Sequence, residues 1–293
     1  MSTQSVKSSS TAKKDDLCLY LYPVPHFERK APPLLKNGIP VHSGNKVRCS
    51  VAGQEVWVTL DSGISDTVLY QSLASKLGFF KGDESTEKVT VTSVMGTEKI
   101  EVVKVKRLML ILEGGHQVCD RALILPDRMA RFHDPFTIVL GSHVLQRAGM
   151  VQTFHHNGST LFVCSPRRVL EPSRRGRRKG VVTFGVLPSG VWGSIMTMVV
   201  STGMYSLYFS SRMRKKLRRK LVTESGPSVT LCIGGNHFLR GIAVKAVPYT
   251  NVDFILGRRL LREHQATMSY KDSKIIIPSG TVSCIISLSR RRV

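Results

Sequence analysis

The sequence repeats itself over a long period, and this repeat limits the folds that are open to the chain. When the sequence is shifted by 140 positions, the segment from Val51 to Gly63 aligns without a gap with the segment from Val191 to Gly203. A period of this length is too long for a solenoid, whose units have roughly 20–50 residues. The 293 residues are therefore expected to form two duplicated domains.

Two further pairs of segments repeat in the same order. Residues 108–126 resemble residues 229–248, and residues 136–154 resemble residues 252–270. Most of these segments are predicted to form strands, because runs of β-branched and apolar residues are broken by Gly, Asn or Asp. Each unit also contains two short helical patterns, one after its first repeated segment and one in "SHVLQRAG" or "RRLLREHQ".

The two units differ in one region. Between Gly78 and Leu108 the first unit has a long segment with a hairpin pattern that turns near Met95, Gly96 and Thr97. The second unit has only a short stretch at the corresponding place. We expect that the second unit has lost this hairpin.

The first repeated segment ends in a motif that carries chemistry. An apolar strand leads into Asp61, Ser62 and Gly63, and the second copy reads Ser201, Thr202 and Gly203. Taken alone, Asp61 could be a turn residue that bonds its own backbone, and Ser201 could be a surface serine. The duplicated context favours a shared functional loop instead.

These elements together resemble the retroviral-type aspartic proteases. The resemblance rests on the Asp-Ser-Gly loop, the hairpin near Gly96, and Val139-Leu140-Gly141 before a short helix. It implies two such loops facing each other, with two carboxylates ~3 Å apart that share one proton and activate a water. Here Ser201 replaces the second aspartate, and Ile64 stands where a small residue is usual, so hydrolysis by this pair is not expected.

The resemblance implies a mostly β fold with two tandem retropepsin-like lobes of the closed β-barrel type around a pseudo-twofold axis. The second lobe would be degenerate and lack the catalytic aspartate. The expected parts of the chain are a disordered start (1–16), an N-terminal extension (17–45), a first lobe with a flap (46–165), a basic linker (166–180), a second lobe (181–280) and a basic tail (281–293).

The charge of the chain points to acidic partners. Lys and Arg number 43 against 20 Asp and Glu, which gives a net charge of +23. Such an excess favours RNA, DNA or another polyanion, although a solvated basic face is the ordinary alternative. The densest cluster lies on an expected helix and is a candidate polyanion-binding face: Arg212, Arg214, Lys215, Lys216, Arg218, Arg219 and Lys220.

Other features restrict the setting in which the protein works. Six cysteines without a CxxC pair, and a polar start, favour a reducing compartment, either cytoplasmic or nuclear. We see no metal-ligand pattern and expect neither a metal nor a cofactor. Residues 181–211 carry no charge, but Pro188, several glycines and many β-branched residues favour strands over a membrane span.

Three functions stay open at this point. The first is an inactive protease-like protein, a monomer with an internal pseudo-dimer, that binds peptides or protein partners. The second is an active aspartic endopeptidase in which two chains pair their first lobes and supply two copies of Asp61. The third is a basic scaffold associated with nucleic acid. Whether the chain is an enzyme depends on which of these holds.

Overall fold

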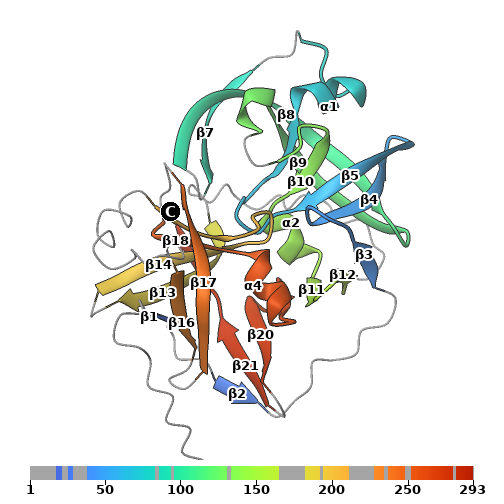
Figure 1. The fold of residues 1–293 in the computed structure, drawn as a ribbon. Helices are drawn as coiled ribbons and strands as arrows, with labels where there is room; N and C mark the ends of the chain where they lie inside the picture. Colours follow the sequence, from blue (N-terminus) through green and yellow to red (C-terminus); the bar gives the residue numbers. More distant parts are fainter. Residues whose placement is uncertain are drawn as a thin grey trace, which may run out of the picture.

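The structure is a computed structural model, and Figure 1 shows its arrangement. It describes residues 18–21, 26–28, 38–82, 86–93, 96–130, 133–164, 182–191, 194–210, 228–233, 237–247, 252–279 and 282–292. Several predicted features lie outside these residues: the disordered start, the linker at 166–180, the basic cluster at 212–220 and the turn residue Met95.

The first lobe is a closed β-barrel with an added hairpin. Its strands pair in the order β4-β5-β10-β6-β9-β8-β7, and an extra β4–β8 pairing closes a ring of six strands. The strands are β4 (Lys46–Val51), β5 (Gln54–Leu60), β6 (Thr67–Tyr70), β7 (Glu87–Ser93), β8 (Gly96–Leu112), β9 (His116–Leu125) and β10 (Thr137–Leu140).

The second lobe closes in a similar way. Its order is β1-β16-β17-β15-β18-β14-β13-β22, and an extra β1–β13 pairing completes the ring. The strands are β1 (Cys18–Leu21), β13 (Val182–Val191), β14 (Ser194–Ser201), β15 (Leu207–Ser210), β16 (Ser228–Ile233), β17 (His237–Val247), β18 (Phe254–Gly257) and β22 (Ser289–Arg292).

Strand pairing is the same in the centres of the two lobes. β5 pairs with β10 in parallel, as β14 does with β18. β6 pairs with β9 in parallel, as β15 does with β17. β9 also pairs with β8 in antiparallel fashion, as β17 does with β16. The predicted mostly β fold of closed-barrel type is confirmed.

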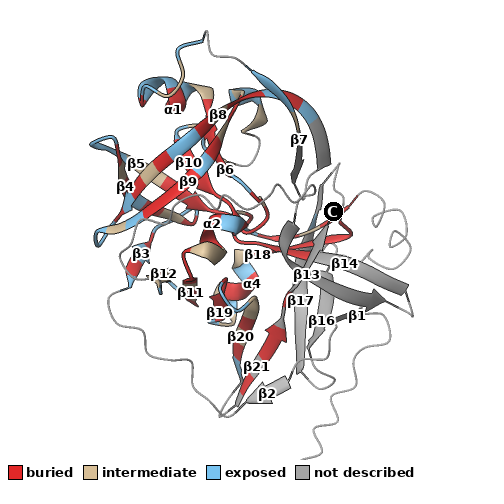
Figure 2. Cartoon of the chain, turned by 180° about the vertical axis from the view of Figure 1, so that it is seen from behind, coloured by how far each residue is buried: buried red, intermediate tan, exposed pale blue. Residues whose placement is uncertain are grey.

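A third sheet joins the two halves of the chain. Its order is β2-β21-β20-β19-β11-β12-β3, and the central β11–β19 pairing sets Val151 opposite Ser269. Its strands are β2 (His26–Glu28), β3 (Ile39–Val41), β11 (Met150–His155), β12 (Gly158–Val163), β19 (Thr267–Ser269), β20 (Lys274–Ser279) and β21 (Val282–Ser287). One buried apolar cluster includes residues of both lobes and of this sheet, and Figure 2 shows where buried residues lie.

The short helices pack on strands of the first barrel, the second barrel and the third sheet. They are α1 (Gln71–Lys76), the 3₁₀ turn η1 (Asp127–Met129), α2 (Ser142–Arg147) and α4 (Arg258–Glu263). α1 buries Leu73, and Leu77 at its end is buried too, as their spacing predicts. α2 and α4 follow Gly141 and Gly257, so the expected helix after each Leu-Gly is confirmed.

The ends of the chain contribute more structure than the sequence suggested. Residues 281–293 were predicted to be a basic tail, but β21 and β22 belong to sheets. The apolar run before the terminal arginines is part of the core, since Ile285, Ile286 and Leu288 are buried. The extension at 17–45 likewise supplies β1, β2 and β3.

The uncharged region at 181–211 forms three strands and the loop of the second lobe where it is described. It contains β13, β14 and β15, which pair within the second lobe. Among the described residues, we find no helix with the length and apolar character needed to span a membrane.

A buried polar chain links the third sheet to the first barrel. The amide of Gln152 donates to Asn45 Oδ1 at 2.6 Å, and the Tyr270 hydroxyl donates to Gln152 Oε1 at 3.0 Å. Asn45 in turn donates to the Leu60 carbonyl at 2.6 Å, one residue before Asp61. Buried polar groups in such a chain fix a single arrangement because each depends on its neighbour.

We predict that Gln152→Leu lowers the free energy of unfolding by about 1–3 kcal/mol, because it leaves the buried Asn45 carbonyl without this donor. Urea denaturation measures the change. Gln117→Leu is the matched control, since Gln117 is exposed on β9 and should change stability by less than about 0.5 kcal/mol. Equal effects of the two variants would contradict a structural role for this chain of bonds.

Candidate active site

The site lies where β5 and β14 end. β5 pairs with β10 in parallel just before the first loop, and the Asp61 amide donates to the Leu140 carbonyl at 3.0 Å. The apolar residues of β5 are buried at its end, so the strand carries Asp61 into the interior, where the residue is 3 % exposed. Parallel pairing of β14 with β18 positions the second loop in the same manner.

The two loops hold each other by hydrogen bonds. The Ser62 hydroxyl donates to the Val200 carbonyl at 2.8 Å and accepts the Thr202 amide at 3.1 Å. The Thr202 hydroxyl donates to the Leu60 carbonyl at 3.1 Å and accepts the Ser62 amide at 3.2 Å. The loops therefore lie together, as the duplication predicts, and each hydroxyl both donates and accepts.

Both glycines of the loops are needed for this close approach. A Cβ atom at Gly63 would lie 2.6 Å from the Ser201 hydroxyl oxygen. A Cβ atom at Gly203 would overlap the Asp61 carboxylate. Only a residue without a side chain fits at either place.

The Asp61 carboxylate accepts several hydrogen bonds on one oxygen. Its Oδ1 accepts the Ser201 hydroxyl at 2.7 Å, the Gly63 amide at 2.8 Å and the Gly203 amide at 3.2 Å. The second loop thus contributes a hydroxyl and an amide, where the resemblance implied an opposing carboxylate.

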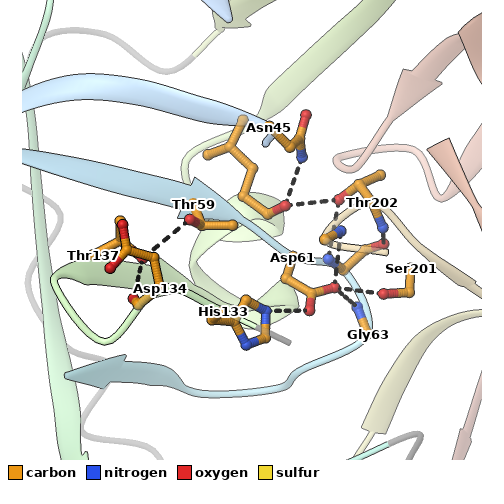
Figure 3. A network of polar contacts seen from close by, with 12 residues as sticks. Asn45, Thr59, Asp61, Gly63, His133, Asp134, Thr137, Ser201 and Thr202 are labelled. Atoms are coloured by element: carbon orange, nitrogen blue, oxygen red, sulfur yellow. Dashed lines mark hydrogen bonds and ion pairs between the residues drawn. The ribbon is translucent and has the colours of Figure 1, made fainter. Parts of the chain in front are cut away.

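The other oxygen of Asp61 contacts a residue that the sequence did not reveal. His133 Nε2 lies 3.0 Å from Asp61 Oδ2, and its side chain is only 9 % exposed. The Tyr70 hydroxyl lies 3.4 Å from His133 Nδ1. Figure 3 shows His133 and Ser201 reaching the carboxylate from different sides.

A turn before β10 positions His133. Asp134 accepts the Phe136 amide at 2.9 Å and the Lys46 ammonium at 2.9 Å, while its carbonyl accepts the Thr137 hydroxyl at 2.8 Å. The only available signal in the sequence was the His-Asp-Pro run just before the apolar strand. Such a run is typical of an ordinary turn, so nothing in it pointed to Asp61.

Two opposing influences set the pKa of Asp61. Burial raises it, but the hydrogen bond and charge of His133 lower it, as do the Gly63 amide and the Ser201 hydroxyl. The net pKa lies below the ordinary value, so the carboxylate is ionised at neutral pH. Burial and the Asp61 charge both raise the pKa of the neighbouring Tyr70, which stays neutral.

The remaining predicted residues fall in different places. Gly96 and Thr97 begin β8, and the β7–β8 hairpin pairs Ser93 with Gly96, so a hairpin exists where a flap was expected. Ile64 is partly buried and packs against a cluster that includes residues of this hairpin. The basic cluster at 212–220 lies outside the described residues, and its role stays a prediction.

We predict that His133→Leu raises the pKa of Asp61, because burial then acts without the imidazole. A carboxylate whose folded pKa is depressed stabilises the fold above its unfolded pKa of about 3.9, and this stability is lost as the pH falls through the folded pKa. In the variant, the loss should be smaller and should be complete at a higher pH, because the folded pKa lies closer to the unfolded one. Carboxyl ¹³C NMR and urea unfolding at several pH values measure both effects.

The control for this variant is His143→Leu, since His143 is exposed on α2. It should leave the Asp61 titration unchanged. An unaltered Asp61 pKa in His133→Leu would show that the imidazole does not hold the carboxylate in its charged form.

Comparison with known proteins agrees with this geometry for the first lobe. Residues 47–144, which contain both Asp61 and Gly141, match the family model described as aspartyl protease. A search of curated proteins found no match. The match and the geometry together support an aspartic protease-like domain in this part of the chain.

Proposed function

We propose that this protein is a pseudoprotease, an aspartic protease fold that binds a peptide or protein partner without cleaving it. The observation that carries the proposal is the 2.7 Å hydrogen bond from the Ser201 hydroxyl to Asp61 Oδ1. In this reading, the second lobe is a degenerate copy of the first that keeps the loop and lacks its carboxylate.

The chemistry of peptide hydrolysis explains why this substitution matters. The two carboxylates of an active pair share a proton, so one acts as base on the water while the other acts as acid. Ser201 cannot take the place of an acid with a tunable pKa near neutrality. Its hydroxyl donates to Asp61, which holds the remaining carboxylate in the ionised state.

His133 supports the same reading. It contacts Asp61 Oδ2, the oxygen that the interlocked loops leave free of other hydrogen bonds in the described part of the chain. An attacking water would need a place beside that oxygen. The imidazole fills it and also lowers the pKa of Asp61, so both effects disfavour the protonation changes of catalysis.

The β7–β8 hairpin offers a means of binding an extended peptide. β7 is the last strand in the order of its sheet, and its described pairing is to β8 alone. The hairpin arches outward from the first barrel (Figure 1). A strand with a free edge can accept an extended peptide through backbone hydrogen bonds, with side-chain pockets giving specificity.

Pairing of first lobes between two chains remains the alternative for an active enzyme. It would require the Ser62–Thr202 bonds within one chain to be exchanged for bonds between chains. These two bonds, with those from Ser62 to the Val200 carbonyl and from Thr202 to the Leu60 carbonyl, already hold the first loop within one chain, which supports the monomeric reading. Activity that rises with protein concentration and survives removal of residues 181–293 would favour the dimer.

A role as a basic scaffold for nucleic acid is a second candidate. Seven of the nine residues from Arg212 to Lys220 are basic, and the net charge is +23. Salt-dependent retention on heparin that falls when this cluster is neutralised would favour it. Peptide binding and polyanion binding could use separate surfaces of one chain.

We predict that the full chain, verified as a monomer, does not cleave a random peptide library between pH 4 and 7. Loss of one acid–base partner costs on the order of 10²–10⁴ in rate, and more where two groups act as a unit. Mass spectrometry of the library detects any cleavage. Cleavage by the monomer that disappears in Asp61→Asn would overturn the proposal, and a gain of activity in Ser201→Asp would support the apposition of the loops.

We also predict that the immobilised chain retains a subset of intact peptides, and that shortening the hairpin reduces this retention about tenfold. Val91 and Glu98 pair across the hairpin, so an Asn-Gly turn can join them and remove only the tip. The unfolding midpoint, measured in parallel, should change little. Equal retention by both forms would exclude the hairpin tip as part of the peptide site.

A further inference from the structure

A cavity of about 460 Å³ lies between three elements outside the Asp61 site. The β3–β4 turn, the β11–β12 turn and the start of α4 form its walls, with Tyr205 beside them. Cavities that hold small ligands have volumes of roughly 300–1,000 Å³. The space is therefore large enough for a small ligand or for one side chain of a partner.

Two arginines give this cavity its chemical character. Arg258 and Arg262 both line it, four residues apart on the same face of α4. Neither makes an ion pair within the described part of the chain. Arg259 lies between them in sequence, but it forms an ion pair with Glu263 at 2.6 Å and is not among the residues that line the cavity.

The hydrogen bonds of these arginines use only part of their donors. Arg258 Nη1 donates to the Gly203 carbonyl at 2.8 Å, and its guanidinium stacks over the Tyr205 ring. Arg262 Nη2 donates to the His156 carbonyl at 2.7 Å, while its buried Nε has no partner among the described groups. A buried N–H without an acceptor is costly, so the described groups satisfy the Arg262 guanidinium only in part.

The electrostatics of the cavity favour an anion. No acidic side chain is found among its described lining residues. Burial lowers the pKa of Arg258, the charges of Asp61 and Tyr208 raise it, and the like charge of Arg262 lowers it. Like charges at this helical spacing repel each other, and a bound anion would offset that repulsion.

We propose that this cavity is a binding site for an oxyanion, either a carboxylate or a phosphate. A guanidinium presents its N–H groups in a planar fork that matches two oxygens of either group. The Asn157 amide and the Ser43 and Ser159 hydroxyls line the same space and can add hydrogen bonds. The anion is either free in solution or carried on an acidic side chain of a peptide.

The test measures binding of inorganic phosphate and, separately, of tetraglutamate to the full chain by calorimetry at constant ionic strength. We expect saturable binding of at least one probe, with affinity lowered about tenfold or more in Arg262→Gln. Arg259→Gln is the matched control, since it removes the same charge from the same helix, and it should stay within about twofold of the wild type because Arg259 is not among the lining residues. Arg258→Gln is a second variant, for which we also expect an affinity lowered about tenfold or more.

The two probes separate the sources of the anion. Binding of phosphate alone indicates a free anion, and binding of tetraglutamate but not tetraglutamine indicates a peptide carboxylate. If neither probe binds saturably at concentrations up to about 10 mM, the proposed site is wrong. Equal losses in Arg259→Gln and Arg262→Gln overturn it too, because they indicate only the general basic surface. These outcomes do not depend on whether the chain cleaves or binds peptides at Asp61.

Discussion

The hydrogen bonds between the Ser62 and Thr202 loops are the constraint on which the rest of the structure depends. They bring the ends of β5 and β14 together, and each loop is set by a parallel strand pair in its own barrel. The third sheet and the buried chain through Gln152 reinforce the same junction. The two barrels therefore cannot shift relative to each other without breaking buried polar contacts, which are costly to leave unpaired.

The site combines the loop geometry of an aspartic protease-like domain with an unusual set of contacts at its carboxylate. The glycines, the interlocking hydroxyls and the buried carboxylate are all present. The contacts of the carboxylate are different: the Ser201 hydroxyl donates to Asp61 Oδ1, and the His133 imidazole contacts Asp61 Oδ2. These contacts favour a fixed charge, while catalysis needs a carboxylate that exchanges its proton.

Local patterns in the sequence predicted the repeated parts of the fold and missed the long-range ones. Asp61, Ser201 and the two glycines could be placed because the duplication aligns them. His133 could not, because its contact with Asp61 depends on a turn that brings it across the barrel. The strands at both ends of the chain were missed for a similar reason, since short β segments such as Cys18–Leu21 gain their structure from distant partners.

The closure of the second barrel has a consequence for the order of folding. The first barrel consists of strands that are close in sequence, from Lys46 to Leu140. In the second barrel, Tyr20 of β1 pairs with both Gly190 of β13 and Cys232 of β16. β1 therefore gains its partners only after these later segments have been synthesised. During synthesis from the N-terminus, the first barrel can form while β1 stays unpaired. The second barrel is therefore completed last, and until then its strands keep unpaired edges of the kind that favour aggregation.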